Sequence, residues 1–221
     1  MRYTVSFNRI ATPHGSPCGI FLRWISVLSV FRGKEKKMKK LQTKALCEGA
    51  IMVALATVLS FIKFFELPQG GSVCIGMLPV IFYAVRWGTK RGLLACFAYG
   101  MLQLLLDGAY AWGWASIIID YLVAFTLLGF AGIFRGKKYG IFFGTVFACL
   151  LRFCAHFISG ITAFRIMAPT ELFNTTFANP YLYSAAYNGS YIFLDMIFCL
   201  VIFALVYKSL SKYILGQDIS Q

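Results

Sequence analysis

Residues 139–162 read YGIFFGTVFACLLRFCAHFISGIT, an apolar run long enough to cross a membrane that also contains one arginine and one histidine. At about 1.5 Å per residue, roughly 20 helical residues match a hydrocarbon core about 30 Å thick. Three cations directly precede the run: Arg135, Lys137 and Lys138. Cations in short loops beside a span mark its cytoplasmic end. The stretch therefore indicates a membrane span with polar groups inside it.

Five further apolar runs accompany this one, at residues 41–62, 73–85, 92–106, 116–134 and 183–207. Hydrophobic residues make up 59% of the 221 residues and the mean hydropathy is +0.73, above the roughly 45 to 50% apolar share of a soluble domain. The second and third runs are short and Pro79 interrupts the second, but the three cations and Gly88 at 86–91 favour a helical hairpin there because they are costly in lipid. We expect an all-α membrane protein in which residues 38–215 form a six-transmembrane-helix bundle.

The lysines and arginines predict how these six helices are oriented. They gather before the first run, between the second and third, between the fourth and fifth, and after the sixth, whereas the opposite loops hold only Lys63 and Arg165. The positive-inside rule then places both termini in the cytoplasm of a multi-pass cell-membrane protein. Because the net charge of +13 is spread over several short loops, we expect no nucleic-acid partner.

The two ends of the chain differ from this domain. Residues 1–37 contain Pro13, Pro17 and a short apolar piece at 19–31, followed by a dense basic run. We interpret them as an N-terminal extension that is disordered or upstream of the true start, for which Met38 is a candidate; a weak signal-like segment or an interfacial helix are alternatives. Residues 216–221 are expected to be a C-terminal tail.

Ionisable residues inside the spans are the first candidates for function, because such groups are rare in lipid unless they are paired, face a cavity or act on a ligand. The chain has five of them: Glu48, Asp120, Arg152, His156 and Asp195. Asp120 lies about five residues from the outer end of its span and His156 about 17 residues from the inner end of the next, so both are expected in the outer half. Tyr183, Tyr187 and Asn188 reach the same level.

An anion, an imidazole, an amide and many aromatic rings at one depth suit a small cationic, aromatic ligand. Purely structural roles for these residues remain as alternatives to ligand binding. Asp120 could pair with Arg152, and His156 could be an interhelical hydrogen bonder. Asp195 and Glu48 are the more natural structural partners of Arg152 and of the basic rim. The residues alone thus predict a membrane protein that binds a small molecule.

Motifs for cofactors and catalysis are missing from the sequence. Two histidines exclude a histidine-rich metal site, the seven cysteines form no CxxC pair, and no nucleotide-binding loop is present. We therefore expect no metal, no cofactor and no catalytic residue, and uphill transport would need an ion gradient or a separate ATP-driven partner. Two other classes remain: a stand-alone ion-coupled carrier that uses Asp120, His156 and Asp195, and an intramembrane hydrolase with Ser159 beside His156.

Several short motifs are spread over about residues 38–212. They are Gly70-Gly71-Ser72, Gly76-Met77-Leu78-Pro79, Arg86-Trp87-Gly88, Gln103-Leu104-Leu105, Asp120-Tyr121, RFCAHFISG at 152–160 and YSAAYNGSY at 183–191. Together they resemble one family, the thiamine-specific substrate-binding (S) components of energy-coupling factor (ECF) transporters, and the last two motifs are the most specific.

This resemblance implies a subunit, not an enzyme, that captures extracellular thiamine and delivers it with a membrane coupling protein and two cytoplasmic ATPases. By the family pattern, the Asp120 carboxylate faces the thiazolium cation. The other substrate-binding positions implied are Tyr110, Tyr121, His156, Gly160, Phe164, Tyr183 and Asn188.

Two departures from the family pattern and one docking surface complete these expectations. The family often has glutamate at the position of Asp120 and tryptophan at that of Phe164. The shorter aspartate and the weaker stacking of phenylalanine in this chain would weaken binding or favour a related pyrimidine or thiazole ligand. The aromatic residue expected from the first outer loop has two candidates, Phe64 and Phe65. Small residues recur four apart on the first helix, and the resemblance assigns Ala50 and Ala54 to docking on the coupling protein.

Overall fold

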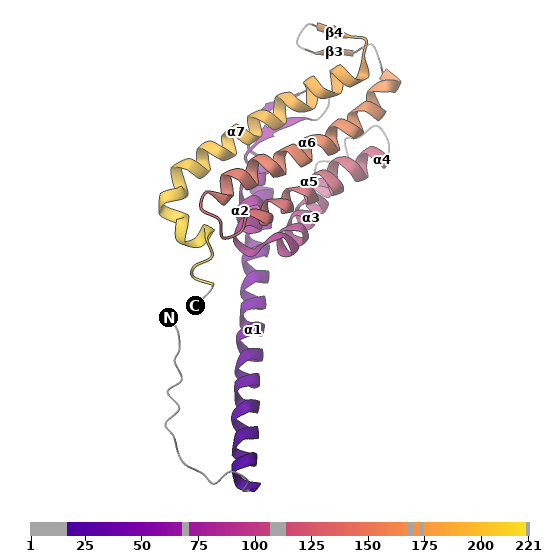
Figure 1. Ribbon diagram of the computed structural model, residues 1–221. Coiled ribbons are helices and arrows are strands. Elements are labelled where there is room, and N and C mark those ends of the chain that lie inside the picture. The colour runs from indigo at the N-terminus through magenta and orange to yellow at the C-terminus, as the bar shows by residue number, and fades with distance from the viewer. Residues whose placement is uncertain (1–16, 68–70, 107–113, 168–169, 173–174, 220–221) are drawn as a thin grey trace. The chain divides into compact units, whose positions relative to one another are not determined.

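The computed structural model describes residues 17–67, 71–106, 114–167, 170–172 and 175–219 (Figure 1). The chain divides into two compact units between Lys44 and Ala45. Helix α1 (Pro17–Ser60) begins in the first unit, and so covers part of the segment for which we expected disorder or an upstream position. Lysine, leucine and alanine are good helix formers, which accounts for a continuous helix through the basic run.

The second unit is helical apart from two short hairpins. After α1 its elements are β1 (Lys63–Glu66), β2 (Ser72–Cys74), α2 (Met77–Trp87), α3 (Thr89–Leu106), α4 (Trp114–Ile117), the π-helix η1 (Ile118–Val123), α5 (Ala124–Leu127), the 3₁₀ helix η2 (Leu128–Phe134), α6 (Gly140–Met167), β3 (Thr170–Leu172), β4 (Thr175–Phe177) and α7 (Pro180–Ile214). β1 pairs with β2 and β3 with β4, both antiparallel. The described residues are mostly helical, in agreement with the expected all-α class. The two hairpins were not predicted, because they are too short to give a clear alternating pattern.

Four segments are long and apolar enough to cross a membrane: Met38–Ser60, Trp114–Phe134, Gly140–Thr162 and Pro180–Ile214. They match the first, fourth, fifth and sixth predicted spans. The second predicted span was wrong at its start, because Val73 and Cys74 belong to β2 and the helix begins at Met77. Pro79 lies in the first turn of α2, where no intrahelical N–H bond is needed, and so does not interrupt the helix.

The predicted hairpin between the second and third helices is confirmed. Gly88 has a φ of 91° between α2 and α3, and its N–H bonds to the Ala84 carbonyl at 2.8 Å. This left-handed conformation is one that glycine adopts without a steric cost. A Cβ on Gly129 would collide with the backbone of Leu93, so α3 and η2 touch backbone to backbone.

A buried ion cluster joins three distant parts of the second unit. Arg86 donates from Nε and Nη2 to Glu48 at 2.8 and 3.1 Å, from Nη1 and Nη2 to Asp218 at 2.7 and 2.8 Å, and from Nη1 to the Tyr213 carbonyl at 2.8 Å. All five guanidinium N–H groups thus have an acceptor. Trp87 Nε1 also donates to Glu48 at 2.7 Å. The cluster ties α1 to α2 and to the residues after α7, as expected for Glu48 in a structural role.

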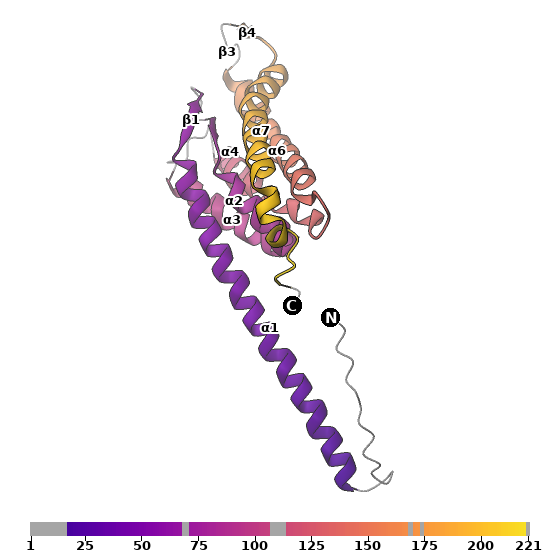
Figure 2. The same ribbon diagram turned by 90° about the vertical axis from the view of Figure 1, so that its left-hand side faces the viewer.

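Helices α6 and α7 run side by side, and both views show this arrangement (Figures 1 and 2). The two helices are antiparallel, and β3 and β4 lie in the connection between them. Asn179 caps α7, because its side chain accepts from the Tyr181 N–H at 2.9 Å while Pro180 occupies the first helical turn. The end of α6, the start of α7 and the start of the Trp114–Phe134 segment therefore come together, and the candidate site lies there.

Candidate functional site

Asp120 and Tyr121 lie on an unusual stretch of helix. Residues Ile118–Val123 form a π-helix, in which the Ala124 N–H bonds to the Ile119 carbonyl five residues back. Single π turns inside α-helices occur frequently at functional sites, because the wide turn changes the direction of the side chains on it. The only acidic residue of the Trp114–Phe134 segment is placed on this turn.

The Asp120 carboxylate receives hydrogen bonds from two helices. His156 Nδ1 lies 2.9 Å from Oδ1, and the Ser159 hydroxyl donates to Oδ2 at 2.7 Å, both from α6. The Ser116 hydroxyl, one turn before Asp120, donates to Oδ2 at 2.6 Å and lies 2.9 Å from the Ser159 oxygen. The Asp120 side chain is 24% exposed, so this carboxylate is partly desolvated and already oriented.

The predicted shared depth of Asp120 and His156 is confirmed by their direct contact. The alternative pairing of Asp120 with Arg152 was wrong: Arg152 Nη1 instead donates to Asp195 Oδ2 at 3.3 Å. The reason is helical spacing. Arg152 precedes His156 by one turn on α6 and so lies deeper in the helix bundle, where α7 supplies Asp195. The expectation that Asp195 is the structural partner of Arg152 is thereby confirmed.

Helix α7 completes the site through Asn188. Its amide nitrogen donates to the His156 carbonyl at 3.2 Å, to the Ser184 carbonyl at 3.0 Å and to the Ser184 hydroxyl at 3.2 Å. Its amide oxygen accepts from the Tyr191 hydroxyl at 3.0 Å. The Ser184 hydroxyl reaches back to the Phe157 carbonyl at 3.0 Å. Asn188 thus belongs to the same polar network as His156, as the sequence predicts.

A row of tyrosines extends this network along α7. Tyr183 stacks on Tyr187 with centroids 5.8 Å apart, and Tyr187 meets the edge of Tyr191 at 5.9 Å. Tyr191 in turn lies 6.0 Å from the His156 ring. The Gly71 N–H donates to the Tyr187 hydroxyl at 2.9 Å, which brings the residue directly before β2 against the same row.

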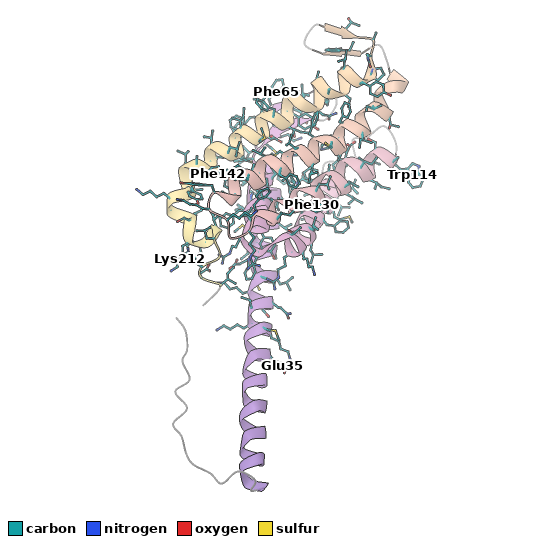
Figure 3. All side chains as sticks on the ribbon, in the orientation of Figure 1. Glu35, Phe65, Trp114, Phe130, Phe142 and Lys212 are labelled. Carbon is teal, nitrogen blue, oxygen red and sulfur yellow. The ribbon has the colours of Figure 1, made fainter. Side chains whose placement is uncertain are left out.

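The remaining predicted site residues fall into two groups. Tyr121 and Gly160 are buried, and they directly follow Asp120 and Ser159 in the sequence. Tyr110 lies outside the described residues, and so does the side chain of Phe164. Of the first-loop candidates, Phe64 stacks on Phe198 at 5.2 Å, and that ring is ten residues along α7 from Asn188, or about 15 Å. Phe65 is 52% exposed (Figure 3).

Four participants of the network were missed as binding candidates: Ser116, Ser159, Ser184 and Tyr191. Spacing was the available signal, because each lies three or four residues from a predicted residue on its own helix. Ser159 was considered only as a nucleophile. In the structure its hydroxyl and the His156 ring both point at the Asp120 carboxylate, an arrangement that presents a fixed anion and does not activate the serine.

The small residues of α1 divide between two faces. Ala45, Gly49 and Ala56 are buried, and the Ala45 carbonyl accepts from the Tyr83 hydroxyl at 2.9 Å. Ala50 and Ala54 are exposed, so their face is available to another helix.

Comparison with known proteins identifies the family. The family model described as thiamine transporter protein (Thia_YuaJ) matches residues 46–215. The thiamine transporter ThiT of Bacillus subtilis is 32% identical over 186 residues, which cover 77% of this chain and 94% of that protein. ThiT of Lacticaseibacillus paracasei is 25% identical, covering 80% and 93%.

A solved structure of ThiT from Listeria monocytogenes has the same fold, with a TM-score of 0.68 over 78% of this chain and 98% of that one, at 23% identity. The family model covers residues 46–215, which is most of the second unit and includes every helix that contributes to the Asp120 network. The chain belongs to the thiamine transporter family, a family of membrane transporters and not of enzymes.

Proposed function

We propose that this chain captures thiamine and delivers it across the cell membrane as the substrate-specific S component of an ECF transporter. The observation that carries the proposal is the Asp120 carboxylate, which Ser116, Ser159 and His156 orient within 2.9 Å. Membership of the thiamine transporter family supports the choice of ligand.

The chemistry of the site fits the parts of thiamine. The thiazolium ring is a cation, and a partly desolvated carboxylate attracts a cation more strongly than it would in bulk water. The tyrosine row offers aromatic faces, each contributing roughly 0.5 to 2 kcal/mol to a stacked or cationic ring. His156, Asn188 and Tyr183 supply directional groups for the aminopyrimidine and hydroxyethyl ends, with Tyr110, Tyr121, Gly160 and Phe164 as the further contacts in this proposal.

The proposed topology has six spans with both termini in the cytoplasm. Four long apolar segments and the α2–α3 hairpin support it, as does the concentration of lysine and arginine in alternate loops. Reporter fusions at residue 215 and at the β3–β4 hairpin test the topology. A cytoplasmic readout at the first and an external readout at the second are expected; the reverse pattern would overturn it.

The proposed partners are a membrane coupling protein and two cytoplasmic ATPases. Ala50 and Ala54 form the proposed contact with the coupling protein, because exposed small residues four apart allow close approach of a second helix. The missing nucleotide-binding loop fits this division of work.

Calorimetry on the purified chain tests the proposal directly. We expect thiamine to bind at one molecule per chain without any ATPase. We also expect tryptophan fluorescence to fall on binding, because Trp112 and Trp114 come shortly before Ser116 and Asp120 in the sequence. Trp114 itself is 79% exposed and points away from the helices (Figure 3). No binding of thiamine, its phosphates or its pyrimidine half would refute the proposal.

An ion-coupled carrier is the second candidate, and the buried Arg152–Asp195 pair is the observation that favours it, because intramembrane charge pairs occur in proton-coupled carriers. Uptake measured with a protonophore, with and without the ATPase partners, separates the two. Uptake that needs the ATPases and survives the protonophore supports the ECF proposal.

A further inference from the structure

A continuous polar chain runs from the candidate site into the core. Asp120 bonds to His156 Nδ1 at 2.9 Å, and Arg152 Nε lies 3.4 Å from the other ring nitrogen, His156 Nε2. Arg152 Nη1 then donates to Asp195 Oδ2 at 3.3 Å, and Asp195 Oδ1 accepts the Cys74 N–H at 2.9 Å. This series of hydrogen bonds thus connects four side chains with the end of β2.

Arginine constrains the imidazole because it can only donate hydrogen bonds. His156 Nε2 faces a guanidinium N–H and must therefore present its lone pair. The ring proton then lies on Nδ1, where it is donated to Asp120. A second proton on Nε2 would direct an N–H at an N–H and bring two cations into contact.

Asp195 and the surrounding residues hold Arg152 in this position. The Asp195 side chain is 0% exposed and that of Arg152 is 8% exposed. The guanidinium carbon lies 4.7 Å from the centroid of the Phe125 ring, and Nη1 lies 3.5 Å from the Met77 sulfur. Contacts from α2, α5 and α7 therefore fix the direction in which Nε points.

We infer that Arg152 and Asp195 are positioning residues that keep His156 as the neutral Nδ1–H tautomer and so leave the negative charge of Asp120 to a cationic ligand. An imidazolium at His156 would neutralise that carboxylate internally. Arg152 opposes this by its charge and by its hydrogen bond, without touching the ligand itself. The preference for a charged over an uncharged ligand thus depends on Arg152 and Asp195, which lie behind the site. The part of this inference that concerns the ligand rests on the proposed function, whereas the part that concerns the His156 tautomer does not.

Nitrogen NMR of the ligand-free protein tests the tautomer. The chain has only two histidines, so labelling histidine with ¹⁵N gives two spin systems, and His14→Gln assigns them. We expect one protonated and one unprotonated nitrogen in His156, with the proton on Nδ1. A proton on Nε2, or on both nitrogens, would overturn the inference even if thiamine binds as proposed.

Paired variants test the positioning role. Arg152→Met with Asp195→Asn removes both charges together, so neither is left buried alone. We expect His156 to keep its Nδ1 proton, which Asp120 accepts, and to gain a second proton on Nε2. The ratio of affinities for thiamine over an uncharged-ring analogue should then fall at least tenfold. Arg152→Lys, which retains the charge but not the planar fork, is the milder variant should the pair fail to fold. We expect its charge to keep His156 neutral and to preserve most of the ligand preference, and a doubly protonated His156 in this variant would contradict the charge argument. A His156 that stays neutral in the folded double variant, with an unchanged affinity ratio, would refute the role of Arg152.

Discussion

Asp120→Asn separates the charge of the site from its shape. An asparagine at this position can keep every hydrogen bond: its carbonyl oxygen accepts from His156 Nδ1, and its amide nitrogen donates to the Ser116 and Ser159 hydroxyls, which can rotate to accept. The substitution therefore removes a charge without leaving a buried group unsatisfied. We expect little change in the stability of the ligand-free protein.

The magnitude follows from Coulomb's law and the exposure of the carboxylate. A ligand cation about 5 Å from the charge, at an effective dielectric constant of about 20, gains roughly 3 kcal/mol, against about 0.8 kcal/mol in bulk water. With 24% of the Asp120 side chain exposed, we expect a loss of roughly 2 to 4 kcal/mol, in the lower part of the range of about 2 to 5 kcal/mol or more for truncating one partner of a buried charge pair. This corresponds to a thiamine Kd about 30- to 900-fold higher.

Isothermal titration of thiamine and of an uncharged-ring analogue is the assay, with thermal unfolding of the ligand-free protein measured in parallel. The analogue should lose much less affinity than thiamine. Ser116→Ala is the matched control, because it removes one donor to the same carboxylate but keeps the charge, and should weaken binding by about 1 kcal/mol or less. If Asp120→Asn changes the thiamine Kd by less than about threefold, or roughly 0.65 kcal/mol, while destabilising the ligand-free protein, Asp120 is a structural residue and the proposed site is misplaced.

Three further predictions concern other parts of the chain. Ala50→Trp should leave thiamine binding intact and impair co-purification with the coupling protein, since the exposed helix face would no longer allow close approach; lost binding with intact assembly would contradict this. Arg86→Met should destabilise the protein by about 3 to 5 kcal/mol, because two carboxylates lose their shared cation, and thermal unfolding in detergent measures it; an unchanged midpoint would argue against the cluster. Gly129→Ala should lower the same midpoint because its Cβ collides with backbone, whereas Gly189→Ala, whose nearest neighbour would be 3.7 Å away, should cost much less; equal effects would refute the backbone contact.

Much of the fold follows from hydropathy and charge. The runs of apolar residues predict the four long segments, and the cations around Gly88 predict the α2–α3 turn. The hairpins could not be predicted, because three- and four-residue strands depend on pairing between segments and not on a local pattern. The contact of Arg86 with Asp218 was also beyond prediction, since it joins residues 132 apart in sequence.

The site was predictable in depth but not in detail. Counting residues from opposite ends of two antiparallel spans brings Asp120 and His156 together, and their contact agrees. The same counting cannot distinguish which carboxylate Arg152 selects, because Asp120 on η1 and Asp195 on α7 are both candidates and the choice depends on how the helices pack. Nor does it predict the π-helix, whose extra residue per turn alters the direction of Asp120 without a sequence signal that we recognised.

The π-helix makes the acidic position sensitive to the length of its segment as well as to its residue type. Deleting one residue between Ile118 and Val123 would remove the wide turn and return the segment to α-helical hydrogen bonding. The side chains on the turn would then change direction, while the helix on either side keeps its register. Asp120 would then leave the hydroxyls and the imidazole that orient it, although every residue of the network would still be encoded. In alignments with relatives, a one-residue gap at this point therefore marks a site of different geometry more reliably than a conservative exchange of aspartate for glutamate.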